Sequence, residues 1–345
     1  MEHGPVFYLI PWALALTLSV GAICAAIRIV RLDRQIVRLE TGRDQSFPLY
    51  YRLGGVILSG IYLVLLMMDG RFEHDARFTA FLIGLLAIIF FSVADDLGHV
   101  TWPWHLSFQI LLGILVFSSG ARFDIGPYLG LFSIDGWMIP SLSFFAIIVW
   151  VILIMNALNW VDGTDGAMPG IAAISFGTVF VLALQPEVNQ PTIALMAATL
   201  LGLSLGLLFF NWYPARILAG TGGAYFFGFA LSILALYAGM KVATVLVVLS
   251  LPILDALFVL ARRIMERRSP FLPDRAHFHH LLLASGWHPA VVAATFLGLT
   301  AFLGFLALIL QDTEKIFAFA FFGAAFAAVS FALHISIRIR RKPSL

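Results

Sequence analysis

Two adjacent carboxylates, Asp95 and Asp96, close an apolar run and are followed by Gly98 and His99. Neighbouring carboxylates repel each other and both resist leaving water, so a bound cation or a shared proton would stabilise the pair. A solvated helix end is the alternative explanation for this motif taken alone. The pair is therefore our first candidate for catalysis or cation binding.

A second polar motif closes a later apolar run. It contains Asn156, Asn159, Asp162 and Asp165, with a glycine after each aspartate. Asn156 and Asn159 lie one helical turn apart and share a face, which Asp162 continues if the helix persists. The glycines let the backbone turn and approach a ligand closely. Because carboxylate and amide oxygens suit Mg²⁺ with phosphate, the motif predicts a metal and phosphate site. A polar loop capped by Asp-Gly turns is the alternative.

A glycine-rich segment, Gly220-Thr221-Gly222-Gly223, follows Asn211 and opens another apolar run. Such a turn at the start of a helix can present backbone N–H groups to an anion. Small residues equally allow membrane helices to pack closely. The sequence leaves both interpretations open.

Three histidines, His277, His279 and His280, occur within four positions and follow Arg275. This cluster can donate hydrogen bonds to phosphate oxygens, and neutral imidazole can also bind zinc. We favour phosphate binding over the alternative, an amphipathic helix at the membrane surface.

The composition is that of a membrane protein. Of 345 residues, 61% are hydrophobic and 12% are charged, whereas soluble domains average about half apolar and about a quarter charged. The apolar residues form long runs, and a helix needs about 20 such residues to cross the hydrocarbon. The formal charge of +2 is too small to suggest a nucleic-acid partner.

We therefore predict an all-α polytopic integral membrane protein with eleven transmembrane helices. The expected spans are 5–29, 49–68, 77–94, 104–120, 138–156, 167–185, 192–212, 222–239, 241–261, 289–310 and 315–336.

The basic residues predict the orientation of these spans. If the N-terminus lies outside, 16 of the 21 Lys and Arg residues fall on the cytoplasmic side. Cytoplasmic loops carry the excess of positive charge in membrane proteins, so we place the N-terminus outside and the C-terminus in the cytoplasm. The external segment 121–137 has short alternating pieces around turn residues, which predict a small β-hairpin. We treat the whole chain, 1–345, as a single membrane domain.

All four polar motifs then fall on the cytoplasmic side, although the orientation came from basic residues alone. Acidic groups, flexible glycines and a basic cluster beside the bilayer are what a phosphate-handling site needs, and Mg²⁺ would neutralise a pyrophosphate there. The membrane setting implies that one substrate is a lipid.

Together these motifs resemble the polyprenyl-phosphate N-acetylhexosamine-1-phosphate transferases, over a core of about 33–283. The motifs that carry the resemblance are Arg52-Leu53-Gly54-Gly55, Asp95-Asp96, the run from Asn156 to Gly166, Phe210-Asn211 with Pro214-Ala215, and Ser269-Pro270 through His280. The Pro273-Asp274-Arg275 preceding His-x-His-His is similar to the branch that starts O-antigen, enterobacterial common antigen and related glycans.

The resemblance implies an enzyme of the bacterial cytoplasmic membrane. Such an enzyme moves a sugar-1-phosphate from a UDP-N-acetylhexosamine, here most simply UDP-GlcNAc, to undecaprenyl phosphate and releases UMP. It implies Mg²⁺ as the cofactor, with Mn²⁺ as a substitute. The transfer is either direct or passes through an enzyme intermediate, and a homodimer is an open alternative to a monomer.

Roles carry over by position. The resemblance assigns catalysis and acceptor activation to Asp95 and Asp96, with Asp162 as a further catalytic residue. The implied metal ligands are Asn159, Asp162 and Thr221. The implied substrate-binding residues are Asp165 and Asn211 near the uridine, Arg52, and Arg275, His277, His279 and His280 at the phosphates.

One departure from the family pattern bears on catalysis. Relatives carry an aspartate, a principal magnesium ligand, where this chain has Thr221. A hydroxyl can coordinate magnesium but lacks the negative charge. A catalytically impaired relative that binds nucleotide-sugar or lipid is therefore an alternative. A lipid or ion transporter is a third, although transporter sites usually lie at mid-membrane and not at one face.

Overall fold

The computed structural model describes residues 6–37, 53–98, 100–123, 138–238, 242–267, 269 and 276–340. Within these ranges every regular element is a helix. In chain order they are α1 (Val6–Val37), α2 (Gly54–Met68), α3 (Ala76–Gly98), α4 (Trp102–Ser118), α6 (Met138–Val161), α7 (Ala167–Leu184), α8 (Pro191–Asn211), α9 (Gly220–Tyr237), α10 (Val242–Val248), α11 (Ser250–Met265), α12 (Phe278–Ala284), α13 (Pro289–Ile309) and α14 (Asp312–Arg340).

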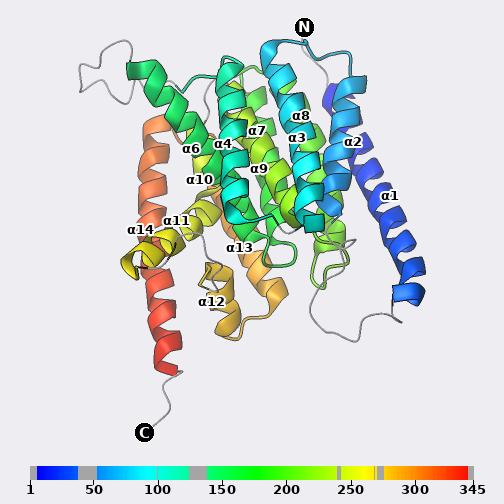
Figure 1. Ribbon diagram of the computed structural model, residues 1–345. Coiled ribbons are helices and arrows are strands. Elements are labelled where there is room, and N and C mark those ends of the chain that lie inside the picture. The colour runs from blue at the N-terminus through cyan, green and yellow to red at the C-terminus, as the bar shows by residue number, and fades with distance from the viewer. Residues whose placement is uncertain are drawn as a thin grey trace.

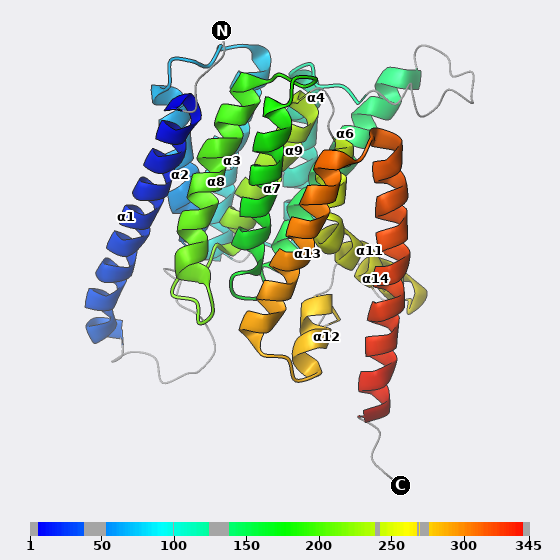
Figure 2. The same ribbon diagram turned by 180° about the vertical axis from the view of Figure 1, so that it is seen from behind.

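The long helices run side by side in one bundle, with α9 near its centre (Figures 1 and 2). Helix α9 packs against α6, α2, α3, α7 and α10 and is the most buried of the long helices, whereas α1 and α14 are mostly exposed. A helix that is apolar on all sides is stable inside a bundle or against lipid. The exposed apolar side chains of α1 and α14 therefore belong against the membrane.

The expected spans match helices in the structure. Among the residues that the structure describes, eight helices are long and apolar enough to cross a membrane, a bent pair makes a ninth, and α2 and α4 are shorter apolar helices. Helix α1 begins at one end of the bundle and α14 ends at the other (Figure 1). The fold is therefore that of a polytopic helical membrane protein, and its orientation across the membrane stays a prediction.

The ninth expected span, 241–261, is not one continuous helix. It is divided into α10 and α11, which are bent by 77° relative to each other. The apolar composition continues through the break at Leu249, so hydropathy alone gave no sign of it. Helix α11 consequently lies across the bundle (Figure 1). Most of the expected hairpin at 121–137 lies outside the described residues.

The start of α2 packs directly on the start of α9 through glycines. The N–H groups of Gly54 and Gly55 donate to the carbonyl oxygens of Leu218 and Ala219, at 3.2 and 3.0 Å. A Cβ on Gly55 would lie 1.9 Å from the backbone nitrogen of Gly223. The glycine-rich segment thus serves close helix packing, the second of its two interpretations.

Replacing Gly55 with alanine should destabilise this contact. The added methyl has no space, and overpacking of this kind typically costs about 1–3 kcal/mol. Gly60→Ala is the matched control, because nothing lies within 4 Å of a Cβ at that position of the same helix. Thermal unfolding in detergent should show a lower midpoint for Gly55→Ala only. Equal midpoints for the two variants would contradict the packing.

Candidate active site

The four polar motifs meet at one end of the bundle. They lie at the end of α3, in the loop between α6 and α7, in the loop between α8 and α9, and on α12. This is the end at which α14 finishes, opposite the start of α1 (Figures 1 and 2). The sequence-based expectation that the motifs share one face agrees with this arrangement.

Asn211 joins two of these segments. Its side chain is 1% exposed. Its Oδ1 accepts a hydrogen bond from the N–H of Gly166 at 2.8 Å, and its Nδ2 donates to the carbonyl of Ile217 at 2.8 Å. Asp165 adds a second connection, because its Oδ2 accepts from the N–H of Ala215 at 2.9 Å. These residues, expected near the uridine, brace the α6–α7 loop against the α8–α9 loop.

Asp95 is held by donors from two sides. The N–H of Val100 donates to Asp95 Oδ1 at 3.1 Å, and the hydroxyl of Thr221 donates to the same carboxylate. Thr221, at the start of α9, therefore lies against Asp95 of the acidic pair. There the Thr221 hydroxyl acts as a hydrogen-bond donor to Asp95.

Asp162 lies in the α6–α7 loop, directly after α6. Burial, assisted by the negative charge of Asp165, raises the pKa of Asp162 to about 8. Near neutral pH its carboxyl is therefore largely protonated unless a positive charge comes close to it. A bound cation would supply that charge and hold the carboxylate ionised.

The histidine motif lies directly against this loop. His279, which is 1% exposed, has two ring nitrogens without a hydrogen-bond partner among the described residues. A Cβ on Gly163 would lie 2.6 Å from His279 Nε2, so the loop backbone passes directly over the ring. Burial is the main cause that lowers the pKa of His279 to about 3, and the neighbouring His280 and His277 are smaller causes. His279 is thus a neutral imidazole with unused polar atoms facing the site.

Asp255 is a functional residue that the sequence did not single out. It lies on α11, is 2% exposed, and accepts from His277 Nδ1 at 2.9 Å and from the N–H of Phe278 at 2.7 Å. It fixes the start of α12 and the orientation of the first histidine of the motif. A lone carboxylate inside an apolar run was the signal that could have found it.

Of the remaining predicted site residues, Asn159 and His280 lie at the same end of the bundle, whereas Arg52 and Arg275 lie outside the described residues. Asn159 is half-buried on the last turn of α6, and the ring of His280 lies 4.1 Å from that of His279 between centroids. Asn156 is turned toward α4, where its Nδ2 donates to Gln109 Oε1 at 2.7 Å.

The donor set fits magnesium. Mg²⁺ prefers oxygen ligands and usually binds through one or two carboxylates, water and substrate phosphates. Asp162, Asn159 and Thr221 offer oxygen atoms, and Asp162 needs a nearby positive charge to be ionised at neutral pH. Among the described residues no three His, Cys, Asp or Glu side chains form a closed metal cage.

The fold defines a helical membrane protein whose four polar motifs gather at one end of its bundle. Residues 78–239 match the model of glycosyl transferase family 4. This match and the similar proteins described next support this family for the chain.

The chain is also similar to several curated proteins. It is 31% identical over 242 residues to a Bacillus subtilis protein named "Probable undecaprenyl-phosphate N-acetylglucosaminyl 1-phosphate transferase", covering 68% of this chain and 63% of that relative. It is 28% identical over 261 residues to the Yersinia pestis undecaprenyl-phosphate alpha-N-acetylglucosaminyl 1-phosphate transferase, covering 71% and 61%. For the Escherichia coli K12 protein of the same name the identity is 25% over 249 residues, covering 68% and 65%. The chain thus spans somewhat less than two thirds of the length of these relatives.

Gly163→Ala should disable the site without unfolding the protein. The new methyl group would displace the His279 ring, so we expect the rate of the reaction at this site to fall by about tenfold or more, as for other misplaced active-site groups. Gly177→Ala is the matched control, since nothing lies within 4 Å of a Cβ there. Both variants should keep the wild-type unfolding midpoint. Full activity of Gly163→Ala would show that His279 does not act at this loop.

Proposed function

We propose that the protein transfers an N-acetylhexosamine-1-phosphate, with GlcNAc as the first choice, from a UDP-sugar to undecaprenyl phosphate. The reaction would take place at the cytoplasmic face of a bacterial membrane and release UMP. One observation carries the proposal: the α6–α7 loop, with Asp162, lies against the neutral His279 at one end of a membrane bundle. The names of the curated relatives support the same acceptor and sugar.

The net reaction needs groups that bind phosphate and a lipid-facing position. An oxygen of the lipid phosphate forms a bond to the β-phosphorus of the donor, and the bond from that phosphorus to the bridging oxygen of UMP breaks. The products are UMP and a lipid-linked diphosphate sugar. A site at one end of an apolar bundle lets the lipid tail stay in the bilayer while its phosphate reaches the site.

The residues divide this work by their chemistry. Asp96, beside the anchored Asp95, would act on the acceptor phosphate. His279, as a neutral ring, would offer one N–H donor to a phosphate oxygen. Magnesium, held by Asp162 with Asn159 and Thr221, would neutralise charge on the departing phosphate. Asp165 and Asn211 would support the donor pocket by fixing the two loops that form it.

The proposal predicts UMP release from UDP-GlcNAc that requires both undecaprenyl phosphate and magnesium. Asp162→Asn and Asp96→Asn should each lower kcat by about 100-fold or more, because each removes a charge from the reacting centre. Asp75→Asn is the matched control, since Asp75 caps the opposite end of α3 through the N–H of Phe78. Activity that survives both site substitutions would contradict the assigned roles.

A catalytically impaired relative is the second candidate, and Thr221 is the observation that favours it. Thr221 donates a hydrogen bond to Asp95, so an aspartate there would place a further negative charge against the acidic pair. We expect Thr221→Asp to lower turnover by about tenfold at limiting magnesium and to recover partly at high magnesium. Thr221→Asn is the control, because asparagine has nearly the same shape as the introduced aspartate but carries no charge. A large gain in turnover from Thr221→Asp would instead show that the natural enzyme is impaired.

A further inference from the structure

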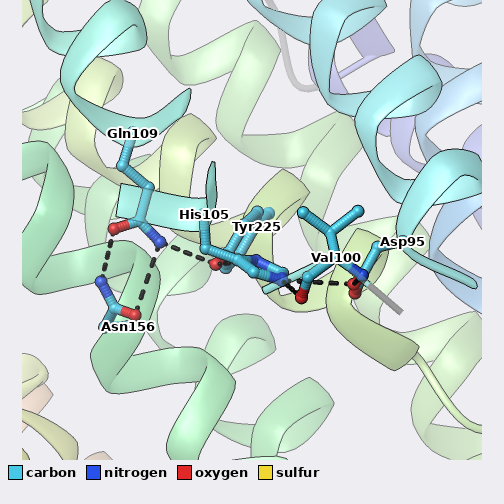
Figure 3. Close-up of polar contacts among 6 residues, drawn as sticks. All are labelled: Asp95, Val100, His105, Gln109, Asn156 and Tyr225. Atoms are coloured by element: carbon cyan, nitrogen blue, oxygen red, sulfur yellow. Dashed lines mark hydrogen bonds and ion pairs between the residues drawn. The ribbon is translucent and has the colours of Figure 1, made fainter. Parts of the chain in front are cut away.

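A line of polar side chains runs from the inside of the bundle to the acidic pair. It begins at Asn156 on α6, passes through Gln109 and His105 on α4 and Tyr225 on α9, and ends at Asp95. Figure 3 shows these residues in one row, joined by dashed lines. The roles assigned above use only the last of them.

The contacts along the line are short. Asn156 Nδ2 lies 2.7 Å from Gln109 Oε1, and Gln109 Nε2 lies 2.7 Å from the Tyr225 hydroxyl. The Tyr225 hydroxyl lies 2.9 Å from His105 Nδ1. His105 Nε2 then lies 3.2 Å from Asp95 Oδ1.

The acceptor atoms along the line determine which residue donates each hydrogen bond. His105 Nε2 faces two acceptors, Asp95 Oδ1 and, at 3.1 Å, the carbonyl oxygen of Val100. A nitrogen placed between two acceptors must carry the proton. In the neutral ring Nδ1 is then an acceptor, so Tyr225 donates to it. Tyr225 in turn accepts from Gln109, so the hydrogen bonds from Gln109 through Tyr225 and His105 run toward Asp95. Gln109 and Asn156 donate to each other, because Gln109 Nε2 also lies 3.4 Å from Asn156 Oδ1.

Aromatic packing fixes the same ring independently. Phe91, one turn before Asp95 on α3, packs edge-on to His105 with ring centroids 5.1 Å apart. Phe91 also stacks on Phe108 at 4.1 Å, with the two rings within 5° of parallel. The orientation of His105 is therefore set both by hydrogen bonds and by packing.

We propose that His105 is a positioning residue, which acts through Asp95 and which Tyr225 and Gln109 hold in the Nε2-protonated form. Groups that orient a reacting carboxylate work by restricting its position, and aligned hydrogen bonds in a low-dielectric interior reinforce one another. The inference deepens the proposed function and rests on it, because Asp95 matters for turnover only if the transfer takes place. It gives Tyr225 and Gln109, which are buried one and two hydrogen bonds away from His105, a part in the reaction.

The kinetic test measures UMP release by His105→Ala, His105→Gln and Tyr225→Phe. Removing an orienting partner typically costs about 10- to 100-fold, so we expect His105→Ala to lose that much in kcat with KM for the donor unchanged. His105→Gln keeps an N–H donor and should recover most of the loss. Tyr225→Phe should lose less than His105→Ala.

The matched control is Tyr237→Phe. Tyr237 lies on the same helix at its other end, where its hydroxyl contacts Ser119 at 2.9 Å and the carbonyl of Arg77 at 3.2 Å. It should keep wild-type kcat. Equal losses of kcat from Tyr225→Phe and Tyr237→Phe would show that the contacts of Tyr225 only stabilise the structure, and would overturn the proposal.

A double-substitution cycle tests whether His105 acts through Asp95. In an Asp95→Asn protein, adding His105→Ala should cost little more, because interacting residues are not additive. Additive losses would overturn the proposal.

A second measurement does not depend on turnover. Histidine labelled with ¹⁵N, studied by solid-state NMR in lipid, should show a protonated Nε2 and an unprotonated Nδ1 for the signal lost in His105→Gln. A protonated Nδ1 would overturn the proposal. If the wild-type protein releases no UMP from any UDP-sugar, the proposed function fails, and the NMR result still decides whether this hydrogen-bond chain exists.

Discussion

The buried amide of Asn211 holds the two loops of the site together. It accepts from Gly166 and donates to Ile217, so both of its polar groups are satisfied by backbone from different segments. A buried amide without such partners would cost about 1–3 kcal/mol, which makes the arrangement strongly favoured over any in which the loops separate. The position of Asp162 above the histidine motif, and of Thr221 beside Asp95, depends on this contact between the loops. Asp165, the residue before Gly166, connects the same two loops a second time, because it accepts a hydrogen bond from the N–H of Ala215.

The membrane setting explains why some of the polar side chains in this protein pair with one another across helices. In hydrocarbon every unsatisfied polar group is costly, so polar side chains must find one another across helices. Asp255 with His277 and the line ending at Asp95 both obey this constraint. Several buried side chains depart from it, among them His279, Tyr62 and Thr300, which have no hydrogen-bond partner within the described part of the chain. His279 lies at the candidate site, where the proposed substrate would be its partner.

The sequence predicted most of the fold, because long apolar runs define membrane helices almost by themselves. It also placed four motifs at one end of the bundle before any contact was known. It did not predict the bend before Ser250, since the apolar run continues through it. The local signal was Pro252 in the first turn of α11, which has no backbone N–H to continue α10. The sequence-based prediction missed Asp255 and His105, because neither belongs to a run of polar residues and each gains its partner only in three dimensions. It assigned Asn156 to the metal-site face, whereas the structure pairs it with Gln109 on α4.

The central claim is that the loop carrying Asp162 and the helix carrying His279 form the two sides of one phosphate site. The most direct measurement is a cryo-EM structure of the protein in a lipid nanodisc with a uridine diphosphate sugar and magnesium. The account predicts that the diphosphate density lies between the α6–α7 loop and α12, with His279 in contact with a phosphate oxygen. Density for the diphosphate elsewhere on the protein, with the α6–α7 loop still closed over an unchanged His279, would contradict it.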